Sequence, residues 1–170
     1  MRKGLIFLIM FLASTKVFAL EIKSDAFENG GYIPDRYSCD SQDFSPFLSW
    51  SDVPANTESL VLICYDPDAP FRVWVHWLLF NIPKNVTELK ENISKEELAA
   101  LGIIQGTNDF GAIGYRGPCP PAGKAHRYFF KLYALDTTLS LKEGVRKKEL
   151  EEAMQGHIIA ETKIMGTYQH

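Results

Sequence analysis

The chain contains three long segments in which apolar residues follow one another almost without interruption. They cover residues 58–66, 74–83 and 126–136, and each is rich in β-branched and aromatic residues and flanked by proline or glycine. Near-continuous apolar runs are typical of central strands whose two faces are both covered, so these segments predict the middle of a sheet. Shorter strands are expected at residues 20–24, 47–50 and 158–168.

Two further segments have the pattern of helices. Ser94 and Glu97 have the capping-box spacing ahead of an apolar run, and Gly102 supplies the stop. The second predicted helix covers residues 142–155, with an apolar stripe that ends at Met154. Many strands and two helices predict a mainly β fold, namely a β-sandwich with two peripheral helices.

A long segment between the first predicted helix and His126 has little regular pattern. Glycines punctuate residues 105–117, and a proline run follows them. A loop of this length in a compact domain is usually functional or disordered. Its aromatic residues and its prolines favour an ordered loop that lines a ligand site.

The N-terminal segment has the form of a secretory signal peptide. Basic residues precede an apolar run over residues 5–13, and Val17 and Ala19 are the small residues that signal peptidase requires. The alternative is a retained membrane anchor, but the run is shorter than the ~20 apolar residues that a span needs. We therefore expect cleavage to remove residues 1–19 and to leave one domain over residues 20–170.

Charge excludes two classes of partner. Cleavage removes three basic residues and no acidic ones, so the formal charge changes from −3 to −6. An acidic chain without a basic stripe is not expected to bind nucleic acid. It also offers no polybasic patch for an anionic membrane and no membrane span after processing.

Three cysteines in an exported chain allow one disulfide and one remaining thiol. Cys64 lies in an apolar strand pattern and is expected to be a core thiol. Cys39 and Cys119 both lie in turn-rich segments and are the more plausible pair. The alternative is that all three cysteines are reduced.

Two proline-rich loops each lead into a strand that carries polar residues in an apolar setting. Residues 66–70 precede a strand that contains His76, and residues 117–121 precede a strand that begins with His126. Proline fixes its own backbone and restricts the residue before it, so such loops hold side chains in place. This combination predicts a small polar pocket with rigid walls.

Strand alternation predicts which of these side chains meet. His126 and Tyr128 share one face of their strand and Arg127 lies on the other, which makes Arg127 a structural residue. His76 is expected to share a face with Leu78. If the two strands are neighbours, both histidines and Tyr128 converge at one end of the sheet.

The chemistry of this group suits an anion, because imidazole and phenol groups can donate hydrogen bonds to phosphate oxygens. Asp66 would repel an anion, so we expect it to hold one histidine in its donor tautomer. The alternative is that His76 is a core histidine and Asp66 caps a turn. The expected apolar walls are Pro67, Pro70, Trp74, Pro118 and Pro120.

Enzyme and metal chemistry find less support in the sequence. There is no Gly-x-Ser-x-Gly motif, and Cys119 has no evident setting that lowers the pKa of its thiol. No His-x-x-x-His or Cys-x-x-Cys spacing is present, so no metal site is expected. No glycine-rich loop has the context of a nucleotide site, so no cofactor is expected.

The two core motifs are similar to those of a known family. Residues 66–70 with Trp74-x-His76, and residues 117–121 with His126-Arg127-Tyr128, resemble the phosphatidylethanolamine-binding protein family, most closely its bacterial Raf-kinase-inhibitor-like branch. The resemblance covers residues 21–168. It implies a β-sandwich with a small pocket for phosphate, acetate or a phosphoryl-ethanolamine head group.

The resemblance also implies which residues form the pocket. They are Asp66, His76, His126 and Tyr128, together with a proline wall that Pro118, Pro120 or Pro121 provides. Val75 stands where animal members often have a second histidine, so that position adds nothing to the pocket.

Three functions remain open. The first is an exported, periplasmic or secreted protein that binds small anions or phospholipid head groups. The second is an inhibitor or scaffold of a protein partner such as a kinase or peptidase, although an exported chain does not meet cytosolic kinases. The third is a hydrolase that uses His76 or His126 as a general base, and it lacks a nucleophile.

Overall fold

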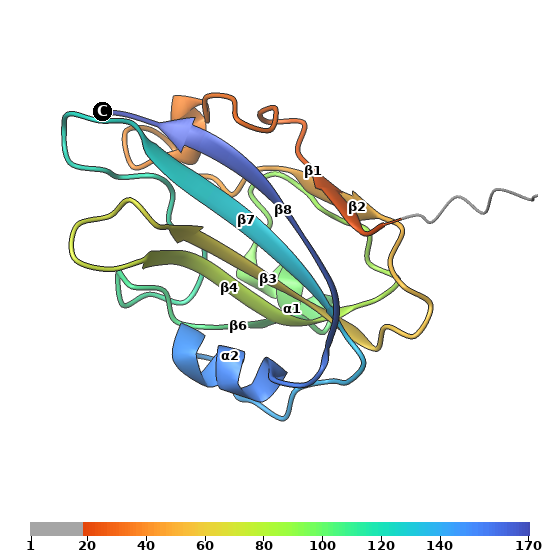
Figure 1. The fold of residues 1–170 in the computed structure, drawn as a ribbon. Coiled ribbons are helices and arrows are strands. Elements are labelled where there is room, and N and C mark those ends of the chain that lie inside the picture. The colour runs from red at the N-terminus through yellow and green to blue at the C-terminus, as the bar shows by residue number, and fades with distance from the viewer. Residues whose placement is uncertain (1–18) are drawn as a thin grey trace, which may run out of the picture.

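Two antiparallel sheets pack face to face in the computed structural model, which describes residues 19–170 (Figure 1). The large sheet has the order β6 (Ile104–Gln105), β4 (Trp74–Pro83), β3 (Ser59–Asp66), β7 (His126–Leu135) and β8 (Ile158–Tyr168). The small sheet has the order β1 (Glu21–Lys23), β2 (Leu48–Ser51) and β5 (Glu88–Leu89). The predicted β-sandwich is therefore confirmed, and the six predicted strands are present with small differences at their ends.

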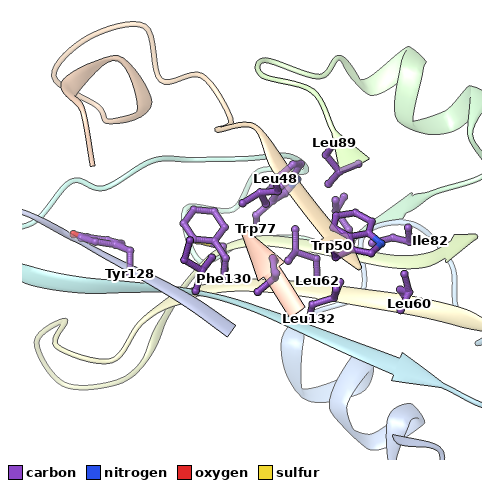
Figure 2. Packing of buried hydrophobic residues seen from close by; sticks show 14 of the residues in the cluster. Leu48, Trp50, Leu60, Leu62, Trp77, Ile82, Leu89, Tyr128, Phe130 and Leu132 are labelled. Carbon is purple, nitrogen blue, oxygen red and sulfur yellow. The ribbon is translucent and has the colours of Figure 1, made fainter. Parts of the chain in front are cut away.

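Strand β3 shows why its segment is almost continuously apolar. Leu60 and Leu62 point into the cluster between the two sheets, where they meet residues of the small sheet such as Trp50 (Figure 2). Val61 and Ile63 point the other way, into a second cluster that packs against α2 (Lys147–Met154). Both faces of the strand are buried, and truncating one such leucine to alanine is expected to cost about 2–5 kcal/mol.

The first helix, α1 (Lys95–Ala100), begins as its sequence predicts. The Ser94 hydroxyl accepts the backbone N–H of Glu97, and the Glu97 carboxylate accepts the backbone N–H of Ser94. Gly102 follows with a φ of 79°, a left-handed conformation that glycine adopts without strain. A short 3₁₀ turn, η1 (Asp35–Tyr37), was not predicted.

The second helix is shorter than the predicted span of 142–155. Gly144 has a φ of 88°, which interrupts a helix, and its N–H donates to the carbonyl of Gln105 in β6. The carbonyl of Val145 accepts the N–H of Thr107. Residues 144–145 therefore pair with the edge of the large sheet, and α2 begins only at Lys147.

A β-bulge in β4 alters the predicted alternation. Cys64 of β3 pairs with Trp77 and the next residue, Tyr65, pairs with Val75, so His76 is the extra residue. The bulge lets His76 and Trp77 lie on the same face of the sheet, and Leu78 lies on the opposite face. The expectation that His76 and Leu78 share a face was therefore wrong, although His76 still faces Tyr128.

The predicted signal peptide falls almost entirely outside the described residues. Among residues 19–170, no helix is long and apolar enough to cross a bilayer. Strands β5 and β6 were not predicted, since two-residue strands leave no periodic pattern to detect.

Candidate ligand pocket

A cavity of about 280 Å³ lies where β3 ends and where β4 and β7 begin. Two proline loops and the long loop before β7 close it. Its lining residues are Asp66, Ala69, Pro70, Phe71, Trp74, His76, Phe110, Cys119, Pro120, Pro121, His126 and Tyr128. The four polar residues expected in the pocket, Asp66, His76, His126 and Tyr128, are thus brought together.

Asp66 and His126 form a buried pair at the base of the cavity. The Nδ1 atom of His126 lies 2.7 Å from Oδ2 of Asp66, and the two residues are 9 % and 3 % exposed. The other carboxylate oxygen accepts the backbone N–H of Asp68 at 2.7 Å. Asp66 therefore fixes the orientation of the His126 ring and closes a turn, so the expected orienting role and the alternative turn role coexist.

The loop after Asp66 is held to β7 by an ion pair outside the cavity. Asp68 accepts hydrogen bonds from Nε and Nη2 of Arg127 at 2.8 and 2.7 Å, and from the Arg127 backbone N–H at 3.0 Å. This bidentate contact supplies defined geometry. Arg127 does not line the cavity, as strand alternation predicted.

The bulge residue His76 forms the opposite wall. Its Nδ1 lies 2.6 Å from the carbonyl of Arg116, and its own carbonyl accepts the Arg116 N–H at 3.1 Å. The imidazole ring meets Tyr128 and Phe110 edge-on, with centroid distances of 5.2 and 5.4 Å. Burial lowers the pKa of His76 below its ordinary value, and the Arg116 carbonyl opposes this shift.

The hydroxyl of Tyr128 is a buried polar group that makes no hydrogen bond to a described residue. The residue is 1 % exposed, and its hydroxyl has no hydrogen-bond partner among the described residues. Burial raises the pKa of Tyr128, the nearby Asp66 carboxylate raises it further, and the Cys119 backbone N–H opposes these shifts without cancelling them, so the phenol stays protonated. A buried hydroxyl without a partner costs about 1–3 kcal/mol, which a ligand in the cavity could recover.

The two histidines present the same ring atom to the cavity. Because a carbonyl or a carboxylate occupies Nδ1 of each ring, Nε2 is the nitrogen left for a ligand. No hydrogen bond to a described residue engages Nε2 of either His76 or His126. With Nδ1 protonated, Nε2 accepts a hydrogen bond in the neutral ring and donates one in the cation.

The walls agree only in part with the sequence expectation. Pro70, Trp74 and Pro120 line the cavity as expected, and Pro121 lies beside them. Pro118 does not line the cavity; it is buried, and its carbonyl accepts the Cys39 N–H at 3.0 Å. Pro67 is also absent from the lining residues.

The long loop expected to line a ligand site does so through an aromatic side chain. Phe110 lies in the wall, beside His76 and edge-on to Trp74. The buried Asn108 shapes this turn, because its Oδ1 accepts the N–H groups of Phe110 and Ala112. Phe71 was not expected in the pocket; the sequence gives no signal for a fully exposed aromatic residue at a left-handed φ of 76°.

The cysteines occupy two different environments. A disulfide joins Cys39 and Cys119, whose Cα atoms are 5.4 Å apart, and Cys119 lies in the pocket wall. Cys64 is a free, buried thiol in β3. The one group of three potential metal ligands found among residues 19–170 lies at this disulfide and not at the pocket histidines.

Comparison with known proteins shows which proteins this chain resembles over most of its length. The phosphatidylethanolamine-binding protein family model matches residues 23–169. A UPF0098 protein of Methanothermobacter thermautotrophicus is 52 % identical over 150 residues, which cover 88 % of this chain and 99 % of the relative. A UPF0098 protein of Chlamydia trachomatis is 48 % identical over 155 residues, with coverage of 88 % and 99 %.

Two solved structures share the fold. A phosphatidylethanolamine-binding protein homolog from Chlamydia trachomatis has a TM-score of 0.82 and 46 % identity, covering 89 % of this chain and 98 % of its own. YbcL of E. coli, described as a member of the mammalian family, has a TM-score of 0.83 and 32 % identity, with coverage of 90 % and 99 %. The chain therefore belongs to the phosphatidylethanolamine-binding protein family.

Proposed function

We propose that this chain binds small phosphate-bearing anions, of the kind found in a phosphoryl-ethanolamine head group, in the cavity between His76 and His126. The observation that carries the proposal is the Tyr128 hydroxyl, which is buried against the cavity without a partner. A ligand oxygen placed there would accept this hydrogen bond. The two Nε2 atoms would complete a three-point site for one tetrahedral group.

Binding in this site is coupled to a proton. Each Nε2 donates to a phosphate oxygen only if its ring is protonated, because Nδ1–H already serves Arg116 or Asp66. Alternatively, a phosphate that carries its own proton donates to a neutral Nε2. Either route takes up a proton with the anion, and the apolar walls strengthen the resulting charge-assisted hydrogen bonds.

A binding role fits the cavity better than hydrolysis. Asp66 and His126 have the base-and-orienter arrangement of a catalytic triad. However, the lining residues include no serine or threonine, and the sulfur of Cys119 is in a disulfide. A hydrolase would therefore have to activate a water molecule, because these lining residues supply no nucleophilic side chain.

We also propose that the chain acts outside the cytoplasm, in the periplasm or after secretion. The signal-peptide pattern and the Cys39–Cys119 disulfide both support export, since disulfides persist in oxidising compartments. Cell fractionation with mass spectrometry should find the mature protein outside the cytoplasm, beginning at Leu20. A full-length cytoplasmic protein with three free thiols would contradict this proposal.

The binding experiment uses mature protein and two ligands, inorganic phosphate and phosphoryl-ethanolamine. Calorimetric titration at pH 6 should give one site per chain, and the H76Q/H126Q double variant should lose at least tenfold in affinity. H157Q is the matched control. His157 also pairs with an aspartate, at 2.8 Å from Asp136, but this pair is exposed and lies at the end of β7 opposite to His126. If folded wild type and folded double variant bind with equal affinity, the anion does not bind at these histidines. Release of phosphate from phosphoryl-ethanolamine would indicate hydrolysis.

A further inference from the structure

Three potential metal ligands from distant parts of the chain meet on the surface beside the pocket wall. Cys39, Cys119 and His170 each offer one ligand atom, and these atoms all lie within 4.8 Å of one another. The three residues are exposed, so ions and reductants can reach them. Thiolate and imidazole together are the ligand set that Zn²⁺ favours in proteins.

The histidine in this group is already oriented as metal-binding histidines are. Its Nδ1 lies 2.9 Å from Oδ2 of Asp40, and Asp40 also accepts a hydrogen bond from the Tyr168 hydroxyl. Metal-bound histidines usually donate their second ring nitrogen to a carboxylate in this way, which fixes the tautomer and leaves Nε2 for the ion. Asp40 is therefore a positioning residue for His170.

The two cysteines are kept adjacent by contacts other than the disulfide. The Cys39 N–H donates to the carbonyl of Pro118 at 3.0 Å. On the same pair of loops, the Tyr115 hydroxyl donates to the carbonyl of Tyr37 at 2.9 Å.

A second anchor lies two residues before Cys119. The Gly117 N–H donates to Oδ1 of Asp43 at 2.6 Å. Gly117 also packs so closely that a Cβ atom there would overlap the carbonyl of Tyr37. None of these contacts involves the disulfide, so we expect them to keep the two cysteines close after its reduction.

We propose that reduction converts the Cys39–Cys119 disulfide into a zinc site completed by His170. A dithiol reductant supplies two electrons and two protons, is itself oxidised to a disulfide, and leaves two thiols. Zn²⁺ then binds both sulfurs and Nε2 of His170, and the thiol protons pass to solvent. A tetrahedral zinc ion holds two thiolates about 3.8 Å apart, a separation that cysteine side chains on Cα atoms 5.4 Å apart can span.

This site would give the chain two alternative cross-links at one place. Cys119 belongs to the pocket wall together with Pro120 and Pro121. The disulfide ties this wall to the loop that carries Cys39 under oxidising conditions, and zinc would tie it under reducing conditions. The proposal does not depend on the identity of the pocket ligand.

The test measures the Zn²⁺ affinity of oxidised and of reduced mature protein by competition with a chromogenic chelator. The reduced protein is first freed of reductant under anaerobic conditions. Reduced protein should bind one Zn²⁺ per chain and oxidised protein none. H170A should weaken binding at least tenfold and D40N about 10–100-fold, because Asp40 acts through the histidine. H157A, which removes the other exposed histidine paired with an aspartate, should leave affinity unchanged.

A second readout identifies the ligands. Co²⁺ added in place of Zn²⁺ should give thiolate charge-transfer absorption in the reduced wild type and not in C39S/C119S. Far-UV circular dichroism reports whether each sample is folded. Four results would each overturn the proposal. Two concern zinc affinity: equal binding by the oxidised protein, and equal loss of affinity in H157A and H170A. The other two concern the reduced protein: no zinc binding although it is folded, or unfolding on reduction.

Discussion

Asp66 and His126 join the end of β3 to the start of β7 through a hydrogen bond of 2.7 Å between Oδ2 and Nδ1. Both side chains are almost completely buried, yet the Nε2 atom of the histidine is left for the cavity. This single contact serves two purposes. It closes the end of the sheet, and it sets the tautomer that a ligand meets.

Removing Asp66 is expected to destabilise the fold measurably. D66A leaves the buried His126 Nδ1–H without its partner, at about 1–3 kcal/mol, and removes the part-buried hydrogen bond of the Asp68 N–H, at about 0.5–1.5 kcal/mol. Urea denaturation should therefore show a loss of about 1.5–4.5 kcal/mol. D68A breaks only the more exposed pair with Arg127 and should cost about 1 kcal/mol or less, so equal losses would contradict the assigned role of Asp66.

Tyr128 should show opposite effects on stability and on binding. Y128F removes a buried hydroxyl that has no partner, so the free energy of unfolding without ligand should stay the same or rise by up to about 1 kcal/mol. The same variant should bind phosphate several-fold more weakly. A marked loss of stability with unchanged phosphate affinity would mean that the hydroxyl serves the fold and not a ligand.

His76 should make the ligand-free protein sensitive to acid. Burial lowers the pKa of His76 in the folded state below its ordinary 6.5, so the unfolded chain takes up a proton first as the pH falls. The contribution of neutral His76 to stability is complete above about pH 6.5 and decreases below it, by at most about 1.4 kcal/mol per pH unit. Between pH 7.5 and 5.5 wild type should lose more stability than H76Q, and parallel curves would exclude this cause.

Anion affinity should decrease as the pH rises, because binding takes up a proton, and burial lowers the pKa of His76 so that the decrease begins below about pH 6.5. Phosphate titrates in the same range and complicates the reading. Sulfate has nearly the same shape and no titration there, so its pH dependence reports the imidazoles alone. Calorimetry with sulfate should show an affinity that falls by up to about tenfold per pH unit for each imidazole that must be protonated, whereas a flat profile from pH 5 to 8 would exclude imidazolium as the donor.

The long strands and the polar group of the pocket could be predicted from the sequence because their signals are local. Apolar runs bounded by turn residues gave the three central strands, and the capping box at Ser94 gave the start of α1. The proline loops that precede the strands of His76 and His126 indicated a rigid pocket. Each of these features depends on neighbours in the chain, so no knowledge of the tertiary structure was needed.

The errors arose where distant segments decide the local structure. At the β4 bulge, the His76 carbonyl accepts the N–H of Arg116, forty positions away, and alternation along the strand alone placed Leu78 on the wrong face. Residues before Lys147 extend along β6 instead of forming helix, because Gly144 hydrogen-bonds to Gln105. Pro118 does not line the cavity, and its carbonyl accepts the N–H of Cys39 on a distant segment instead.

The potential metal ligands show the same limit most clearly. Cys39, Cys119 and His170 have no spacing that a motif could capture, and only the folded loops bring them together. The expectation that the chain has no metal site stays a prediction, which the zinc titration would test.

In the proposed site, Nε2 of His76 and Nε2 of His126 both contact the bound anion. Histidine-selective ¹⁵N NMR of the mature protein, titrated with inorganic phosphate at pH 6, tests this atom by atom. We predict saturable shifts of both Nε2 signals with one dissociation constant, while the His157 signals stay in place. Saturable binding that leaves the Nε2 signals of His76 and His126 unchanged would contradict it.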